Sequence, residues 1–272
     1  MDSIMKLPTY FISHGGGPWP YMPEMQASNT ALAASLAGIP AQIGRKPEAI
    51  LMVSAHWETA GTFKVMSASK PGMVYDYHGF PAHTYEVRYP APGAPGLADR
   101  VLQLLRAADL PVQKDSQRGF DHGAFVPAFV MYPDADVPMV QLSIDAQYDP
   151  ERHLALGRAL APLRNEGVLI VGSGLSYHNL RQIYGGGAAA SAQFDAWLQQ
   201  TLLHSPVEQR GQLLRNWENA PAARLAHPRE DHLIPLMVAA GAAENEAAAC
   251  VYHEALAFAG ITASSFRFGP AA

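Results

Sequence analysis

Two short runs of the chain are almost continuously apolar, and they constrain the fold more than any other feature. Residues 49–55 read AILMVSA, and residues 167–172 read GVLIVG. A strand with apolar side chains on both faces has to be covered on both faces, which is typical of the interior of a parallel sheet. The two runs therefore predict a buried central sheet with helices on either side.

The remaining pattern extends this prediction to the whole chain. Apolar runs alternate with helical patterns, which favours an α/β layer architecture over an all-β one. Strands are expected at residues 9–13, 49–55, 62–67, 137–143, 167–172, 248–253 and 264–268. Helices are expected at residues 29–37, 96–108, 122–131, 150–164, 192–204 and 231–240. We predict one α/β domain over residues 1–272, with a central, largely buried mixed β-sheet flanked by helices on both faces.

Charge and composition exclude several classes of function. The formal net charge is −5, and no cluster of Lys and Arg is longer than a pair, so the chain lacks the basic stripe that phosphate binding needs. The single cysteine, Cys250, excludes an internal disulfide and a cysteine-based zinc cage. No apolar stretch is long enough for a secretion signal or a membrane span. We expect a cytoplasmic protein that binds neither nucleic acid nor a membrane.

Four histidines stand where strand-like runs stop or where a helix is expected to begin. These are His14, His56, His178 and His232. A single histidine at such a place is more often a hydrogen-bonded structural residue than a ligand. A set of four is different, because residues at the ends of buried strands are held rigidly and can converge on one metal ion. The set therefore indicates a mononuclear metalloenzyme.

The run Ser13-His14-Gly15-Gly16-Gly17-Pro18 has a second interpretation. A His-Gly-Gly-Gly run also forms the oxyanion hole of some α/β-hydrolases. That function requires a G-x-S-x-G turn, and the nearest run, residues 172–176 (GSGLS), is out of register. Metal binding by His14 is the better explanation.

Asp231 precedes His232 at the expected start of a helix. Adjacent helical residues point about 100° apart, so the two side chains are not both expected to bind the same metal. Asp231 is instead expected to orient a ligand from outside the metal site, or to cap the helix.

The segment 71–95 departs from the alternating pattern, since its prolines and glycines exclude a regular helix. It is long for a loop without a function, and either a substrate lid or a structured surface loop would explain it. Its polar and aromatic side chains would contact a substrate or simply pack locally: Tyr75, Asp76, His78 and His83. The Gly- and Ala-rich residues 185–190 are expected to form a flexible link.

Taken in order, the motifs resemble the class III extradiol ring-cleaving dioxygenases, most closely the DOPA 4,5-dioxygenase branch. The resemblance covers nearly the whole chain. It rests on seven segments, namely residues 13–18 (SHGGGP), 54–57 (SAHW), 75–81 (YDYHGFP), 119–123 (GFDHG), 140–145 (VQLSID), 172–181 (GSGLSYHNLR) and 227–236.

The resemblance implies a set of site residues. His14, His56 and His232 would hold the metal, and His178 would be either a further ligand or the acid/base residue. His122 matches a second active-site histidine of the family. Relatives that cleave protocatechuate use a glutamate as the third ligand, where this chain has His232.

Substrate contacts are less strongly implied. We expect Tyr75 and His78 to reach the substrate from the loop, and Arg181 to recognise a substrate carboxylate. A structural ion pair is the alternative for Arg181.

The implied activity is the ring cleavage of a catechol-type compound, such as DOPA or caffeate, with O2 to give a muconic-semialdehyde product. Fe(II) is the expected cofactor, and Zn2+ would fit the same imidazole ligands. Histidine suits the proton transfers because its ordinary pKa of about 6.5 lets it act as base and then as acid near neutral pH. The alternatives are a zinc-dependent hydrolase and a non-catalytic binding protein on the same fold.

Overall fold

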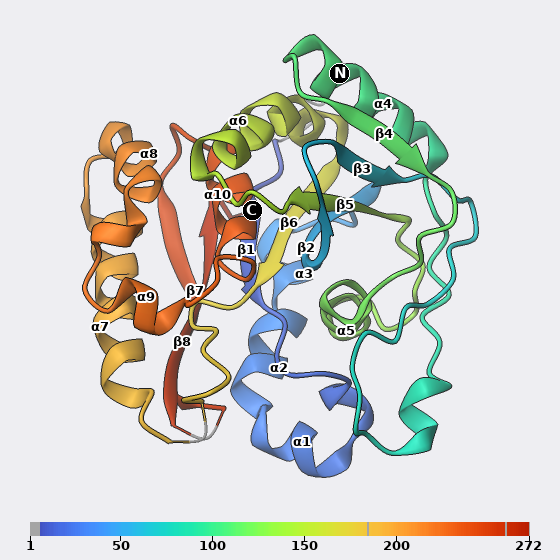
Figure 1. The fold of residues 1–272 in the computed structure, drawn as a ribbon. Coiled ribbons are helices and arrows are strands. Elements are labelled where there is room, and N and C mark those ends of the chain that lie inside the picture. The colour runs from blue at the N-terminus through green and yellow to red at the C-terminus, as the bar shows by residue number, and fades with distance from the viewer. Residues whose placement is uncertain (1–5, 184, 259, 272) are drawn as a thin grey trace.

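One mixed sheet organises the chain, in agreement with the predicted α/β class. The structure, a computed structural model, describes residues 6–183, 185–258 and 260–271. Within these ranges, eight strands pair in the order β4-β3-β5-β2-β6-β1-β8-β7 (Figure 1). Their bounds are β1 (Thr9–Ser13), β2 (Ala49–Thr59), β3 (Phe63–Met66), β4 (Val112–Asp115), β5 (Met139–Asp145), β6 (Val168–Gly174), β7 (Ala248–Ala257) and β8 (Ile261–Phe268).

The four central strands β5, β2, β6 and β1 are parallel, and antiparallel pairs occur on both sides of them. Every residue of β1, β5 and β6 is buried, as is β2 from Ala49 to Ala55. This is the expected result for strands that are covered on both faces. Because the central strands are parallel, their C-terminal ends share one edge of the sheet.

Helices cover both faces of the sheet, as predicted. Figure 1 shows α6 and α10 on one side and α2 and α5 on the other, and both α10 and α5 contact the central strands β2 and β6. The α-helices are α1 (Pro23–Ser28), α2 (Thr30–Ala37), α3 (Ile39–Ile43), α4 (Pro95–Ala107), α5 (His122–Met131), α6 (Pro150–Leu160), α7 (Ala188–Gln199), α8 (Val207–Arg215), α9 (Ala223–Ala226) and α10 (Ile234–Gly241). No helix in the described ranges is both long and apolar enough to cross a membrane.

Several expected boundaries were wrong. Strand β4 was not predicted, because only Val112 of its four residues is buried and the strand lies at the sheet edge. The flexible link expected at 185–190 is shorter than predicted, since α7 already begins at Ala188, where a run of alanines favours helix. The helix expected at 150–164 ends at Leu160 and continues as a 3-10 helix from Ala161 to Glu166.

Candidate metal centre

The C-terminal edge of the parallel strands carries the first two histidines. His14 directly follows β1, and its backbone N–H donates to the carbonyl of Gly174 at the end of β6 (3.2 Å). His56 was expected just beyond a strand ending at residue 55, but β2 continues to Thr59. The pairing of β2 with β5 shifts register between Val53 and Glu58. An irregularity of this kind redirects side chains, so His56 reaches the site from within the strand.

His232 reaches the site through a close backbone contact. The predicted helix over 231–240 begins at Ile234, so His232 lies in the turn that precedes α10. The carbonyl of His232 accepts a hydrogen bond from the N–H of Leu175 (3.1 Å). A Cβ on Gly174 would overlap that carbonyl, so the turn can approach β6 only because residue 174 is glycine.

Three imidazole nitrogens converge on one point. Nε2 of His56 lies 3.2 Å from Nε2 of His14 and 3.2 Å from Nε2 of His232. Two nitrogen ligands at about 2.1 Å from one metal ion are about 3.0–3.4 Å apart at angles from about 90° to 109°. The spacing of the three Nε2 atoms therefore fits a single divalent cation.

The Nδ1 atoms of the same three rings face groups that accept hydrogen bonds. Ser173 Oγ donates to the carbonyl of Gly123 (2.5 Å), so at 3.1 Å from His14 Nδ1 it acts as the acceptor. A carboxylate oxygen of Asp76 lies 3.3 Å from His56 Nδ1, and one of Asp231 lies 3.1 Å from His232 Nδ1. Both carboxylate contacts are within ion-pair distance, but neither is aligned as a hydrogen bond.

This arrangement decides which nitrogen carries the hydrogen. A neutral imidazole has one N–H, and the acceptors place it on Nδ1, which leaves an unshared electron pair on each Nε2. Electron pairs on Nε2 atoms 3.2 Å apart, as in the pairs His14–His56 and His56–His232, repel one another unless a cation lies between them. The donor set therefore fits a metal ion that is held by His14, His56 and His232.

Burial keeps the three rings neutral. Loss of solvent, together with the neighbouring imidazoles, lowers the pKa of both His14 and His56 well below the ordinary 6.5. Burial lowers the pKa of His232 to about 4, since the Asp231 carboxylate opposes the shift only in part. Neutral imidazole is the form that binds a metal, so the site is ready to accept a cation near neutral pH.

Two more histidines border the three candidate ligands. The ring of His122 lies with its centroid 4.0 Å from that of His56 and 5.3 Å from that of His14. The ring of His178 stacks on His232 at 3.4 Å. Nδ1 of His178 lies 3.7 Å from an oxygen of Asp231. All five predicted histidines are thus brought together. Besides the close Nε2 atoms of His14, His56 and His232, candidate ligand atoms of His14, His56 and His122 lie within 4.8 Å of one another, as do those of His178, Asp231 and His232.

A buried carboxylate that the sequence analysis did not single out connects two of these histidines. Asp121 is the N-cap of α5, which begins at His122. Its carboxylate accepts hydrogen bonds from Ser54 Oγ (2.8 Å) and from Nη2 of Arg118 (2.7 Å). Nη2 of Arg118 also donates to the carbonyl of His56 (3.2 Å). The polar Ser54 and Ser173 inside otherwise apolar strands were the available sequence signal for such contacts.

The segment 71–95 is a structured loop packed beside the histidines. Tyr75 donates its hydroxyl to the carbonyl of Val87 within the loop (2.7 Å). The ring of Tyr77 meets His122 edge to face at 5.9 Å. The ring of Phe80 fills the space where a Cβ on Gly17 would lie. The structured-loop alternative therefore describes this segment.

The candidate substrate contacts differ in exposure and in hydrogen bonding. His78 and Arg181 are exposed, and Arg181 forms no ion pair with another described residue. The hydroxyl of Tyr75 is engaged by the loop backbone. The exposed Arg181, three residues after His178, has no ion pair among the described residues, so the structural ion pair considered above is not observed.

Ser173 also bears on the α/β-hydrolase interpretation of the His-Gly-Gly-Gly run. It lies within β6, fully buried, and its hydroxyl is engaged by His14 and Gly123. A hydrolase nucleophile has to be exposed on a sharp turn after a strand. Ser173 therefore cannot take that role.

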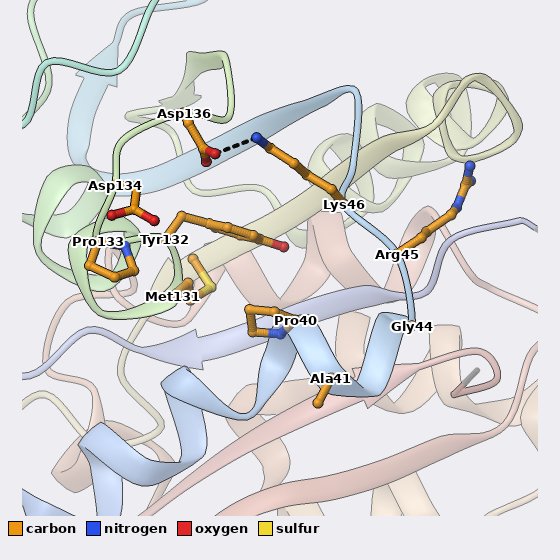
Figure 2. A pocket seen from close by; sticks show the side chains of 10 residues that line it. All are labelled: Pro40, Ala41, Gly44, Arg45, Lys46, Met131, Tyr132, Pro133, Asp134 and Asp136. Atoms are coloured by element: carbon orange, nitrogen blue, oxygen red, sulfur yellow. Dashed lines mark hydrogen bonds and ion pairs between the residues drawn. The ribbon is translucent and has the colours of Figure 1, made fainter.

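A separate hollow of about 530 Å³ is shown in Figure 2. It lies between the turn that follows α3 and the segment that follows α5, where Lys46 and Asp136 form an ion pair of 2.5 Å. These segments lead into β2 and β5, so the hollow is at the N-terminal edge of the parallel strands, away from the histidines. Its lining contains neither histidine nor cysteine, and we assign no chemistry to it.

Known proteins resemble this chain along nearly its whole length. The family described as "Catalytic LigB subunit of aromatic ring-opening dioxygenase" matches residues 8–269. A 4,5-DOPA dioxygenase extradiol of Beta vulgaris is 39% identical and covers 98% of this chain and 97% of its own length. A protein with the same name from Escherichia coli (strain K12) is 35% identical, covering 98% of this chain and 96% of its own.

A solved structure supports the fold independently. The crystal structure of an uncharacterized protein from Escherichia coli K12 matches with a TM-score of 0.75 at 31% sequence identity. The match covers 97% of this chain and 100% of that one.

Proposed function

Because this chain belongs to the aromatic ring-opening dioxygenase family, we propose that it cleaves the ring of a catechol-type compound beside its two hydroxyl groups. In this reaction one carbon–carbon bond of the ring and the O–O bond of O2 break. Both oxygen atoms enter the muconic-semialdehyde product, so no external reductant is needed. DOPA and caffeate are the first candidates, since relatives with 34–40% identity are named for 4,5-DOPA.

The observation that carries the proposal is that Nε2 of His56 lies 3.2 Å from Nε2 of both His14 and His232, and that the Nδ1 of each ring faces an acceptor. His14, His56 and His232 would hold the metal. Fe(II), when bound there, would supply the redox chemistry that joins a catechol to O2. Zn2+ would fit the same three nitrogens without that redox chemistry.

The flanking histidines are suited to move protons. Nδ1 of His122 donates to Asp76 (2.9 Å), which leaves Nε2 free to accept the proton of a catechol hydroxyl. His178 stacks on His232, and Asp231 lies beside its Nδ1. This position favours the acid/base role for His178 over that of a fourth ligand. Arg181, exposed and three residues further on, is available for a substrate carboxylate.

Metal-dependent oxygen uptake tests the proposal. The protein is loaded anaerobically with Fe(II), and O2 consumption is measured with DOPA, caffeate, protocatechuate and homoprotocatechuate. We expect uptake of one O2 per catechol and a yellow semialdehyde absorbance with at least one substrate. Protein loaded with Zn2+ is the matched control and should consume no O2. Absence of uptake across the panel in Fe(II)-loaded protein contradicts the proposal.

A further inference from the structure

Asp76 touches two histidines of the site at once. One of its carboxylate oxygens lies 2.9 Å from Nδ1 of His122 and accepts the backbone N–H of the same residue (3.0 Å). The other oxygen lies 3.3 Å from Nδ1 of His56. We propose that Asp76 is a positioning residue that fixes both rings with their hydrogen on Nδ1. Asp76 would then link metal binding by His56 to proton transfer by His122. This role rests on the proposed function.

The chemical reason lies in what a carboxylate can accept. Its oxygens take hydrogen bonds and donate none, so an Nδ1 that faces Asp76 is favourable only if that nitrogen carries the ring hydrogen. For His56 this frees the Nε2 that meets His14 and His232. For His122 it frees the Nε2 that we assign to proton transfer. One carboxylate thus selects the working tautomer of a candidate ligand and of a candidate base.

The fold holds Asp76 in place through backbone pairing. The N–H of Phe120 donates to the carbonyl of Gly72 (2.9 Å), and the N–H of Val74 donates to the carbonyl of Phe120 (2.8 Å). Next along the two segments, the N–H of His122 donates to the side-chain carboxylate of Asp76. The pairing is close enough that a Cβ on Gly119 would overlap the backbone of Gly72. Asp76 is therefore delivered by a stretch that is tied to the start of α5.

Of the other two candidate ligands, only His232 has a partner that also faces a flanking histidine. Ser173 serves His14 alone. Asp231 lies near both His232 and His178, but its oxygens are 3.1 Å and 3.7 Å from their Nδ1 atoms without aligned hydrogen bonds. The Asp76 side chain is only 18% exposed and bonds His122 through both ring and backbone. Among these partners Asp76 couples the two functions most directly.

The hydrogen positions can be observed without metal or substrate. In the metal-free wild-type protein, 15N–1H correlation spectra of the imidazoles should show the hydrogen of both His56 and His122 on Nδ1. Hydrogen on Nε2 of either ring in the wild type overturns the proposal without any variant. Because this readout requires no turnover, it remains valid even if no catechol is cleaved.

Asp76→Asn then tests whether the carboxylate is responsible. The amide can accept from one ring but presents N–H groups to the other, so at least one histidine should move its hydrogen to Nε2. We expect Zn2+ affinity, measured by calorimetry, to fall about 10- to 100-fold, as for other groups that orient metal ligands. Asp136→Asn is the control, because that carboxylate is exposed at the other end of the sheet.

The outcomes separate the two proposals. Unchanged tautomers and unchanged Zn2+ affinity in Asp76→Asn overturn the positioning role of Asp76. Altered tautomers and weakened Zn2+ binding, with no dioxygenase activity in the Fe(II)-loaded wild type, support the positioning role and contradict only the proposed reaction. If Asp76→Asn does not fold, the wild-type spectra still test the proposal, because hydrogen on Nε2 of His56 or His122 overturns it.

Discussion

Nε2 of His14 lies 3.2 Å from Nε2 of His56, although 42 positions separate the two residues in the sequence. A hydrogen bond between two imidazoles would need a hydrogen on one of these atoms. Ser173 and Asp76 instead draw the hydrogens to Nδ1. The short distance therefore fits a cation held between the two nitrogens.

A bound metal should stabilise the fold. Zn2+ at about 100 times its Kd should raise the free energy of unfolding by about 2.7 kcal/mol, because the unfolded chain does not assemble the three ligands. His56→Ala should abolish this increase, whereas His204→Ala, which changes an exposed histidine remote from the site, should retain it. Thermal unfolding with and without chelator measures the effect. If Zn2+ raised the unfolding free energy of His56→Ala as much as that of the wild type, the metal would bind elsewhere.

Replacing His122 or His178 with Ala should slow turnover more than it weakens substrate binding. Loss of a proton-transfer group lowers kcat about 10²- to 10⁴-fold. We expect KM to change much less, since neither ring is assigned to hold the substrate. Metal analysis of the His178→Ala protein is the decisive control. Retained metal supports an acid/base role, and lost metal identifies His178 as a ligand.

Gly174→Ala should damage the metal centre without touching a histidine. The added Cβ would overlap the carbonyl of His232, so the turn before α10 has to move away from β6. Overpacking of this kind costs about 1–3 kcal/mol. Because His232 moves with the turn, the metal affinity should also fall, and calorimetry measures it. Gly96→Ala is the control, because a Cβ at that position meets no atom within 4 Å.

The buried His153 should make stability fall in mild acid. Burial lowers its pKa from 6.5 to about 4, while its ring bonds the N–H of Asp145 (3.0 Å) and the carbonyl of Asp149 (2.7 Å). Below pH 6.5 the unfolded chain gains a proton that the folded state does not bind until about pH 4. The stability present above pH 6.5 is therefore lost as the pH falls through this window, by about 3 kcal/mol from this residue.

Chemical denaturation between pH 7 and pH 4 measures this effect. His153→Gln should show a shallower dependence of the unfolding free energy on pH than the wild type. His204→Gln should show the wild-type dependence, because its side chain is exposed. Identical slopes for wild type and His153→Gln would rule out the assigned role of His153.

Arg164→Met should destabilise the fold strongly. The fully buried guanidinium donates to the carbonyls of Leu7 (2.6 Å) and Ala242 (2.8 Å) and pairs with both oxygens of Glu246. Breaking a buried pair while leaving carbonyls without donors costs about 3 kcal/mol or more. Arg100→Met removes the exposed pair with Glu166 and should leave the denaturation midpoint almost unchanged.

Much of the fold could be predicted because burial leaves a periodic pattern. The strand at Thr9–Ser13 and the helix at His122–Met131 have the bounds expected from the sequence. The runs at 49–55 and 167–172 lie in central strands, as continuous apolar character indicates. Strand β4 was missed because it is short and mostly polar at the sheet edge, where no burial pattern is imposed.

The sequence by itself indicated the α/β class and four of the five histidines, because buried strands and their ends leave a signal in local composition. His122 was predicted only from the family resemblance. The family resemblance already implied three ligands and two further histidines, and tertiary structure decided which ring atoms lie close together. Their placement depends on the register shift in β2 and on the space left by Gly174. It also depends on which acceptor faces each Nδ1. Ser173 and Asp76 come from other parts of the chain than the histidines that they face, whereas Asp231 is the sequence neighbour of His232. Contacts between remote segments leave no periodic signal, so only the folded chain reveals them.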